Sequence, residues 1–238
     1  WQRDEEYAKK IDKATAMERA KKSLKDDLLS GFDCLHIDAS RSPFPEDCEP
    51  RTPGKTTVQI RVERTIELLA FAERVRQMEM LPAVTYEVGG EEPVWDEPAI
   101  ERLKEFMTIL RERLESQGLN NAPVDFITFN PAPLKGRSTD QYDVDKRLTK
   151  RLATMIRQAG FIPKFHNGDF TSPSDREILP RIGVHTLNIA PELGYAQTSS
   201  LLDFADEEDE SSATLGFEPS RFRTVLTDAV LRGEGWKK

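Results

Sequence analysis

The chain alternates between short apolar runs and longer segments in which apolar residues recur every three or four positions. The longer pattern is typical of amphipathic helices that cover a core on one side. It predicts helices over residues 7–30, 57–80, 97–117 and 142–158, and a shorter helix over Ser174–Ile182. The short apolar runs between these helices are typical of buried strands.

Five such runs predict five strands, and a helix-sized segment separates each strand from the next. They lie in Phe32–Asp38, Leu81–Val88, Val124–Phe129, Phe161–Pro173 and Gly183–Glu192. Regular alternation of strand and helix indicates a parallel α/β fold. A doubly wound sheet is possible, although no glycine-rich phosphate loop follows any strand. We favour a TIM (β/α)8 barrel, of which the chain represents only about five of the eight strands.

For the domain organisation, we expect a single barrel domain over residues 1–238, with the N-terminal strands of the barrel missing from the sequence. Acidic residues concentrate after Leu202, which predicts a solvated, mobile loop over residues 203–218. Apolar residues at helical spacing return in residues 219–238 and predict a C-terminal helical tail.

Composition narrows the class of protein. Of the 238 residues, 37% are hydrophobic and 32% are charged, the net charge is −8 and the isoelectric point is about 5.1. This excess of acid argues against binding to nucleic acid or to anionic membranes. No apolar run approaches the ~20 residues of a transmembrane helix. Cys34 and Cys48 lack metal-ligand spacing, so we expect a buried thiol at Cys34 in a reducing cytoplasm, with a Cys34–Cys48 disulfide as the alternative.

Polar side chains occur near the carboxyl ends of the predicted strands, where a barrel places its active site. The candidates are His36, Asp38, Glu87, Asn130, Lys164, His166 and Asn188. His36 and Asp38 share one parity along their strand, as do Lys164 and His166, so each pair faces the same way. Such a mixture suits a polyol or keto sugar, a divalent metal ion, or proton transfer.

Each candidate also has a structural interpretation. His36 could be a core histidine, and Asp38 and Glu87 could cap neighbouring loops or helices. Lys164 could form a Schiff base with a ketose, or an ion pair with Glu87 or Asp38. A catalytic zinc site needs about three protein ligands. His166 is the clearest imidazole ligand, so a metal site would also need His36, carboxylates, or residues on barrel strands that the sequence does not contain.

Several of these segments resemble the class II ketose-bisphosphate aldolase superfamily. His36-Ile-Asp-Ala-Ser40 with Ser42-Pro-Phe-Pro-Glu46 resembles that family's Met-Ile-Asp-Gly-Ser strand with its downstream Pro-Phe-Glu-Glu. Glu87-Val-Gly-Gly-Glu-Glu92 resembles its Glu-Leu-Gly…Gly-Glu-Glu strand. His166-Asn-Gly168 resembles the His-Gly-Gly that carries a zinc-binding histidine, and Gly183–Glu192 resembles a segment whose Asn contacts substrate. The resemblance implies that the five strands are the fourth to eighth of the barrel.

Within this superfamily, the chain most resembles the non-catalytic subunit family of D-tagatose-1,6-bisphosphate aldolase. The likeness lies in Leu35-His-Ile-Asp-Ala-Ser40, in His166-Asn-Gly-Asp-Phe-Thr-Ser-Pro173 and in the tail from Pro219 to Lys238. It implies a sugar or sugar-phosphate ligand, a class II aldolase catalytic subunit as partner, and an oligomeric assembly.

The chain also departs from the zinc aldolases of the superfamily. Phe129-Asn-Pro-Ala-Pro133 stands where they place a second histidine, and Asp169 and Glu192 stand where they bind phosphate. Carboxylates beside a phosphate dianion are unfavourable. We therefore hypothesise an aldolase-like accessory subunit of ketose-phosphate metabolism of the tagatose or galactitol type.

The alternative is a metal-dependent epimerase or aldolase, the latter a lyase, that acts on a sugar or sugar acid. His166 would then bind zinc or manganese, and Asp38 and Glu87 would be the catalytic carboxylates. The substrate-binding residues would be Asn130, Asn167, Asp169, Asn188 and Glu192. A barrel that binds a ligand without chemistry is a third class.

Overall fold

The computed structural model describes residues 11–39, 57–89, 95–131 and 141–233. The chain forms two compact units, residues 1–188 and residues 189–238, and each is described by itself. The expectation of one domain over residues 1–238 missed this division. Helical periodicity continues on both sides of the boundary, so the sequence pattern does not mark it.

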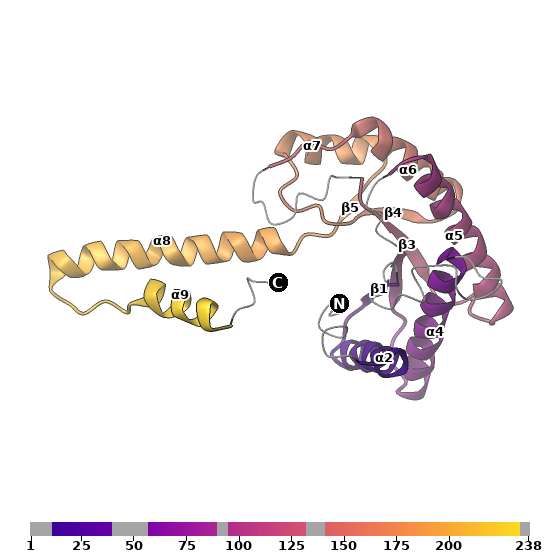
Figure 1. Ribbon diagram of the computed structural model, residues 1–238, viewed down its shortest axis with the longest axis horizontal. Coiled ribbons are helices and arrows are strands. Elements are labelled where there is room, and N and C mark those ends of the chain that lie inside the picture. Colours follow the sequence, from indigo (N-terminus) through magenta and orange to yellow (C-terminus); the bar gives the residue numbers. More distant parts are fainter. Residues whose placement is uncertain (1–10, 40–56, 90–94, 132–140, 234–238) are drawn as a thin grey trace. The chain divides into compact units, whose positions relative to one another are not determined.

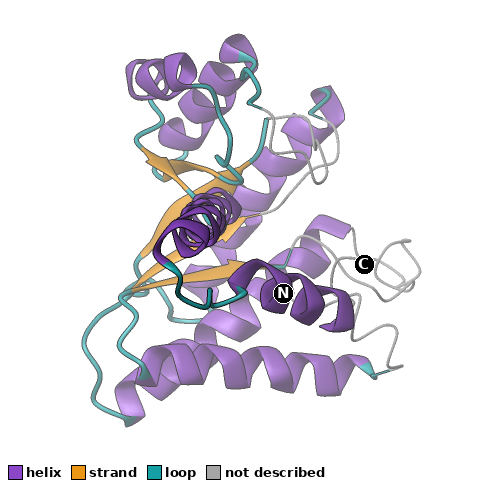
Figure 2. Cartoon of the chain, turned by 90° about the vertical axis from the view of Figure 1, so that its left-hand side faces the viewer, coloured by secondary structure: helices purple, strands orange, loops and turns teal. Residues whose placement is uncertain are grey.

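The first unit is built on a sheet of five parallel strands (Figure 2). The strands are β1 (Cys34–Asp38), β2 (Thr85–Gly89), β3 (Val124–Phe129), β4 (Ile162–Phe165) and β5 (Thr186–Leu187). They lie in the sheet in the order in which they occur in the sequence. A doubly wound sheet reverses its strand order at a switch point, so that alternative was wrong. Sequential order is consistent with part of a (β/α) barrel.

The helices of this unit follow the predicted positions closely. They are α2 (Lys13–Leu29), α4 (Thr57–Met78), α5 (Glu97–Ser116), α6 (Lys146–Gln158), α7 (Pro173–Ile178) and the 3-10 helix η1 (Leu179–Ile182). Aspartate caps begin α5 and α6, since the side chains of Asp96 and Asp145 accept hydrogen bonds from the amides of Ala99 and Leu148, both at 2.9 Å. The helix predicted over Ser174–Ile182 continues as a 3-10 turn that contains Pro180.

The hydrophobic core lies between the sheet and these helices. Figure 1 shows α4, α5 and α6 along one side of the strands. The strand residues that face them alternate in sequence and are all buried: Leu35 and Ile37, Tyr86 and Val88, and Ile127 and Phe129. The intervening residues must therefore face the opposite side of the sheet, which we call the open face.

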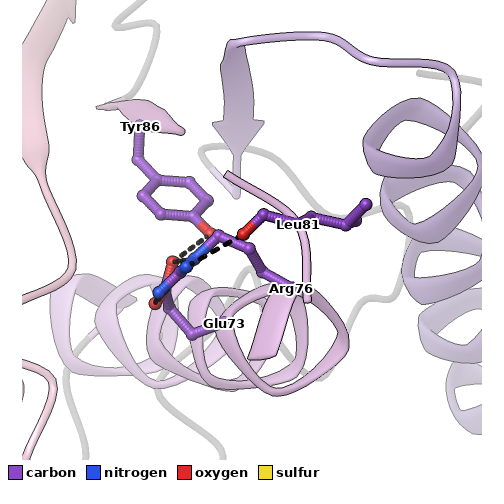
Figure 3. A network of polar contacts seen from close by, with 4 residues as sticks. All are labelled: Glu73, Arg76, Leu81 and Tyr86. Atoms are coloured by element: carbon purple, nitrogen blue, oxygen red, sulfur yellow. Dashed lines mark hydrogen bonds and ion pairs between the residues drawn. The ribbon is translucent and has the colours of Figure 1, made fainter. Parts of the chain in front are cut away.

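A polar network ties α4 to β2 within this core (Figure 3). The Tyr86 hydroxyl donates to Glu73 at 2.8 Å, and Arg76 donates to both carboxylate oxygens of Glu73. Burial alone would raise the pKa of Glu73, but the hydrogen bonds from Arg76 and Tyr86 outweigh it and lower the pKa. Burial and the bond to Glu73 raise the pKa of Tyr86. The network thus fixes the helix against the strand that carries Glu87 on its other face.

The second unit contains α8 (Pro191–Leu215) and α9 (Phe222–Gly233), which contact each other. The acidic mobile loop predicted over residues 203–218 was wrong, because residues 203–215 belong to α8. Their carboxylates are solvated along a helix that ends at Gly216, whose φ is 73°. The Arg223 guanidinium of α9 bonds to Asp206 of α8 at 2.6 and 3.0 Å. The helical tail predicted over residues 219–238 is confirmed for Phe222–Gly233, which form α9, and residues 234–238 lie outside the described residues.

None of the helices in the described part of the chain has the length and apolar character required to cross a membrane.

Candidate functional site

Glu87 forms the centre of a polar cluster on the open face. It is only 2% exposed, although it lies on the side of β2 away from the core. Its Oε2 atom lies 2.5 Å from the Nζ atom of Lys164 on β4, and its Oε1 atom accepts a hydrogen bond from the side-chain amide of Asn188 at 2.6 Å. The ion pair that the sequence offered for Lys164 is confirmed, with Glu87 as its partner. Residues on β2 and β4 and just after β5 therefore meet at one carboxylate.

Two histidines extend this cluster. His36 is opposite Glu87 in the register of β1 and β2, and its Nδ1 atom lies 3.4 Å from Oε1 of Glu87. The rings of His36 and His166 lie edge to face with centroids 5.1 Å apart. His36 therefore belongs to the open face, and the interpretation as a core histidine was wrong. The His36 side chain is 28% exposed. Its partial burial lowers its pKa below the usual 6.5. The nearby His166 also lowers this pKa, whereas the charge of Glu87 acts to raise it.

Lys164 is held from a second side by an aromatic ring. Its Nζ atom lies 5.1 Å from the centroid of Phe126 on β3, a distance typical of a cation–π contact. Sequence reasoning missed Phe126 as part of the site. The available signal was its parity along the strand. Phe126, Thr128 and Asn130 are spaced by two residues and therefore share one face.

Backbone hydrogen bonds fix the loop that follows β4. The amide of His166 donates to the carbonyl of Phe129 at 2.9 Å, and the amide of Gly168 donates to the carbonyl of Asn188 at 2.9 Å. The Tyr142 hydroxyl donates to the carbonyl of Asn167 at 2.9 Å. Asn167 has a φ of 57°, a conformation that side-chain-bearing residues seldom adopt. The loop is therefore tied to the ends of β3 and β5.

The other predicted site residues divide into three groups. Asp38 ends β1 and is half-buried, and its charge acts to raise the pKa of His36. Asn130 is buried just after β3, and its backbone carbonyl accepts a hydrogen bond from the Trp95 indole. Asn167 and Asp169 lie in the loop after β4, where Asn167 is exposed and Asp169 is half-buried.

Glu192 was predicted as a substrate-binding residue together with the others. It lies in the first turn of α8 and so belongs to the second unit. The cluster of the first unit is therefore described without it.

The cluster does not fit a divalent metal ion in its present arrangement. A catalytic zinc site needs about three protein ligands and an open position. Across the described ranges, no group of three or more His, Cys, Asp or Glu side chains has the geometry to hold a metal ion. His36 and His166 offer two imidazoles, but the neighbouring carboxylate of Glu87 is paired with an ammonium group and an amide. We therefore derive no chemical step through a metal ion.

Comparison with curated proteins found relatives over most of the chain. It is 26% identical over 237 residues to the D-tagatose-1,6-bisphosphate aldolase subunit GatZ of Klebsiella oxytoca, covering 94% of this chain and 55% of that protein. The GatZ subunits of Klebsiella pneumoniae and Salmonella gallinarum are 25% and 24% identical, each with the same 94% of this chain covered. The chain thus spans about half the length of the curated relatives it matches. No protein-family model matches it.

A solved structure supports the fold. The crystal structure of a probable tagatose 6 phosphate kinase from Sinorhizobium meliloti superimposes with a TM-score of 0.67 and 22% identity, covering 94% of this chain and 54% of that one. At this identity the likeness carries the fold alone. The resemblance indicated by the sequence motifs is confirmed by the curated relatives: over nearly its whole length the chain is similar to D-tagatose-1,6-bisphosphate aldolase subunits.

Proposed function

We propose that this chain is part of an aldolase-like accessory subunit in ketose-phosphate metabolism of the tagatose or galactitol type. In this proposal β1 to β5 are the fourth to eighth strands of a TIM (β/α)8 barrel. The subunit supports the activity and stability of a class II aldolase catalytic subunit within an oligomeric complex. Similarity to D-tagatose-1,6-bisphosphate aldolase subunits over 94% of the chain supports it.

The observation that carries the non-catalytic role is the pairing of Glu87. A carboxylate that already pairs with an ammonium group and an amide has fewer lone pairs left to take a proton or bind a metal ion. Here Lys164 lies 2.5 Å from one oxygen and Asn188 donates to the other. This arrangement suits the binding of sugar hydroxyl groups better than proton abstraction. The proposed ligand of the open face is accordingly a sugar or sugar phosphate, with Asn130, Asn167, Asp169 and Asn188 as further hydrogen-bonding groups.

A metal-dependent sugar epimerase or aldolase is the second candidate. The observation in its favour is the edge-to-face pair of His36 and His166, which brings a second imidazole next to the histidine that lies beside Glu87. In that candidate His166 binds zinc or manganese, and Asp38 and Glu87 carry out proton transfer.

Reconstitution with a catalytic subunit tests the proposal. A class II D-tagatose-1,6-bisphosphate aldolase catalytic subunit is purified with and without this chain, and its specific activity and its half-life at a fixed temperature are measured. We expect the two proteins to co-purify and the chain to prolong the half-life of the activity. An inert protein at the same concentration is the control for nonspecific stabilisation. Equal activity and equal half-life in all three samples would sink the accessory role.

A further inference from the structure

We propose that the Lys164 ammonium group occupies the cation position of the open-face site, so that the site operates without a divalent metal ion. The inference concerns the chemistry of the site and does not depend on the accessory role. It begins from the burial of Glu87, which is 2% exposed. A positive charge beside a carboxylate in that position offsets the cost of burial, because burial strongly disfavours an isolated charge.

Lys164 supplies that charge from a fixed position. Its Nζ atom lies 2.5 Å from Oε2 of Glu87, and its side chain is 17% exposed. The ring of Phe126 lies on another side of the ammonium group, with its centroid 5.1 Å from Nζ. The stem of the side chain starts from β4, between β3 and β5 in the sheet. A carboxylate and an aromatic ring thus both favour a cation at this point.

The groups around this cation are those that a zinc ion would otherwise use. His36 lies 3.4 Å from Glu87, and the His36 and His166 rings are 5.1 Å apart. Two imidazoles and one carboxylate match the usual number of protein ligands by count, although no three such groups in the described ranges are arranged to hold a metal ion. A metal ion bound to Glu87 would have to displace Lys164 or Asn188 from its oxygens. It would also lie within a few ångströms of a like charge, which is unfavourable in a buried site.

The remaining chemistry favours hydroxyl groups as ligands. Asn188 adds an amide beside the ion pair, and the carboxylate and ammonium groups are good partners for neighbouring hydroxyls. We therefore infer that the site takes a polyhydroxylated ligand through hydrogen bonds rather than through metal coordination.

Metal titration of the wild-type chain and a Lys164→Met variant tests this inference, with Co²⁺ and Zn²⁺ alone as probes. Methionine keeps the length and apolar stem of lysine but removes the charge. We expect no saturable binding to the wild type by calorimetry and no Co²⁺ d–d absorption band. The variant should bind saturably, about tenfold or more above the detection limit set by the wild type, and a second substitution, His166→Ala, should remove that gain, since ligands and their neighbours commonly change metal affinity by about 10–100-fold.

Two further variants sharpen the test. Lys104→Met removes an ammonium from an exposed ion pair with Glu101 and should leave metal binding as in the wild type. Should Lys164→Met fail to fold, Lys164→Gln replaces it, because glutamine can still donate a hydrogen bond to Glu87. One equivalent of Zn²⁺ bound to the wild type and lost in His166→Ala would overturn the inference. So would the absence of any gain in the folded Lys164 variant.

Discussion

Glu87 combines deep burial with a position on the side of the sheet away from the core. Its parity along β2 could be read from the sequence, because Tyr86 and Val88 on either side are apolar or aromatic core residues. The sequence only narrowed the partner of Lys164 to two carboxylates, Glu87 and Asp38. The order of the strands favours Glu87, since β2 lies nearer than β1 to β4 in the sheet, and this order is not encoded in a local pattern.

Replacing Glu87 by glutamine should destabilise the protein. The substitution leaves the Lys164 ammonium without its counter-charge at a site where that side chain is 17% exposed. We expect a decrease in the free energy of unfolding of about 3 kcal/mol, the low end for a broken buried ion pair, because Lys164 keeps some contact with water. Urea denaturation measures the change. Glu101→Gln, in an exposed pair with Lys104, is the matched control and should stay near wild-type stability.

The imidazole of His36 should titrate below pH 6.5. Burial lowers its pKa and His166 contributes in the same direction, so the neutral form is favoured in the folded state. Because the folded pKa lies below the unfolded value, this group makes stability rise with pH between those two values. NMR titration measures the midpoint, with a His36→Gln variant to assign the resonance. A midpoint at or above 6.5 contradicts the account, and His166→Asn should shift the midpoint upward.

At the scale of elements, the hydrophobic periodicity predicted the strands and helices of the first unit, but it did not predict the helix formed by the acidic residues after Leu202. Alternating apolar residues such as Leu35 and Ile37 located the strands and their core-facing sides. The acidic segment after Leu202 was interpreted as a loop because of its high density of charge. That interpretation gave too little weight to its Ala, Glu and Leu residues, which favour a helix. In α8 those charges lie on an exposed helix, with only Ala205 buried.

The network of Glu73, Arg76 and Tyr86 should stabilise the packing of α4 against β2 and so contribute to the free energy of unfolding (Figure 3). Tyr86→Phe removes the hydrogen bond at 2.8 Å to the buried carboxylate, and we expect a loss of about 1–2 kcal/mol in the free energy of unfolding. Urea denaturation of Tyr86→Phe, Arg76→Met and the double variant measures the coupling between the two bonds. Strictly additive losses would show that the three groups do not act as one network.

The same network should make stability depend on acid pH. The pKa of Glu73 is lowered in the fold from its usual 4.5, so its contribution is fully present above that value. It is lost as the pH falls through the lower, folded-state pKa. A Glu73→Gln variant should therefore lose less stability than the wild type between pH 5 and acid denaturation, as measured by thermal unfolding across this range. An identical acid dependence in both proteins contradicts this assignment.

At the scale of the whole molecule, a parallel sheet in sequential strand order carries the Glu87 cluster on its open face, and the curated relatives are aldolase subunits. The parallel α/β class followed from strand and helix alternation. The division at Asn188 did not, because helices that pack on a sheet and helices that pack on each other share one periodicity. Glu192, grouped with the site from the motif, lies beyond that division.

The most direct test of the central claim is the cleavage of D-tagatose-1,6-bisphosphate by this chain alone, assayed with Zn²⁺ supplied. We expect no cleavage above the rate without protein, because Lys164 pairs with the carboxylate that a metal ion would need. Zinc-dependent cleavage by the wild-type chain that disappears in His166→Ala would contradict it.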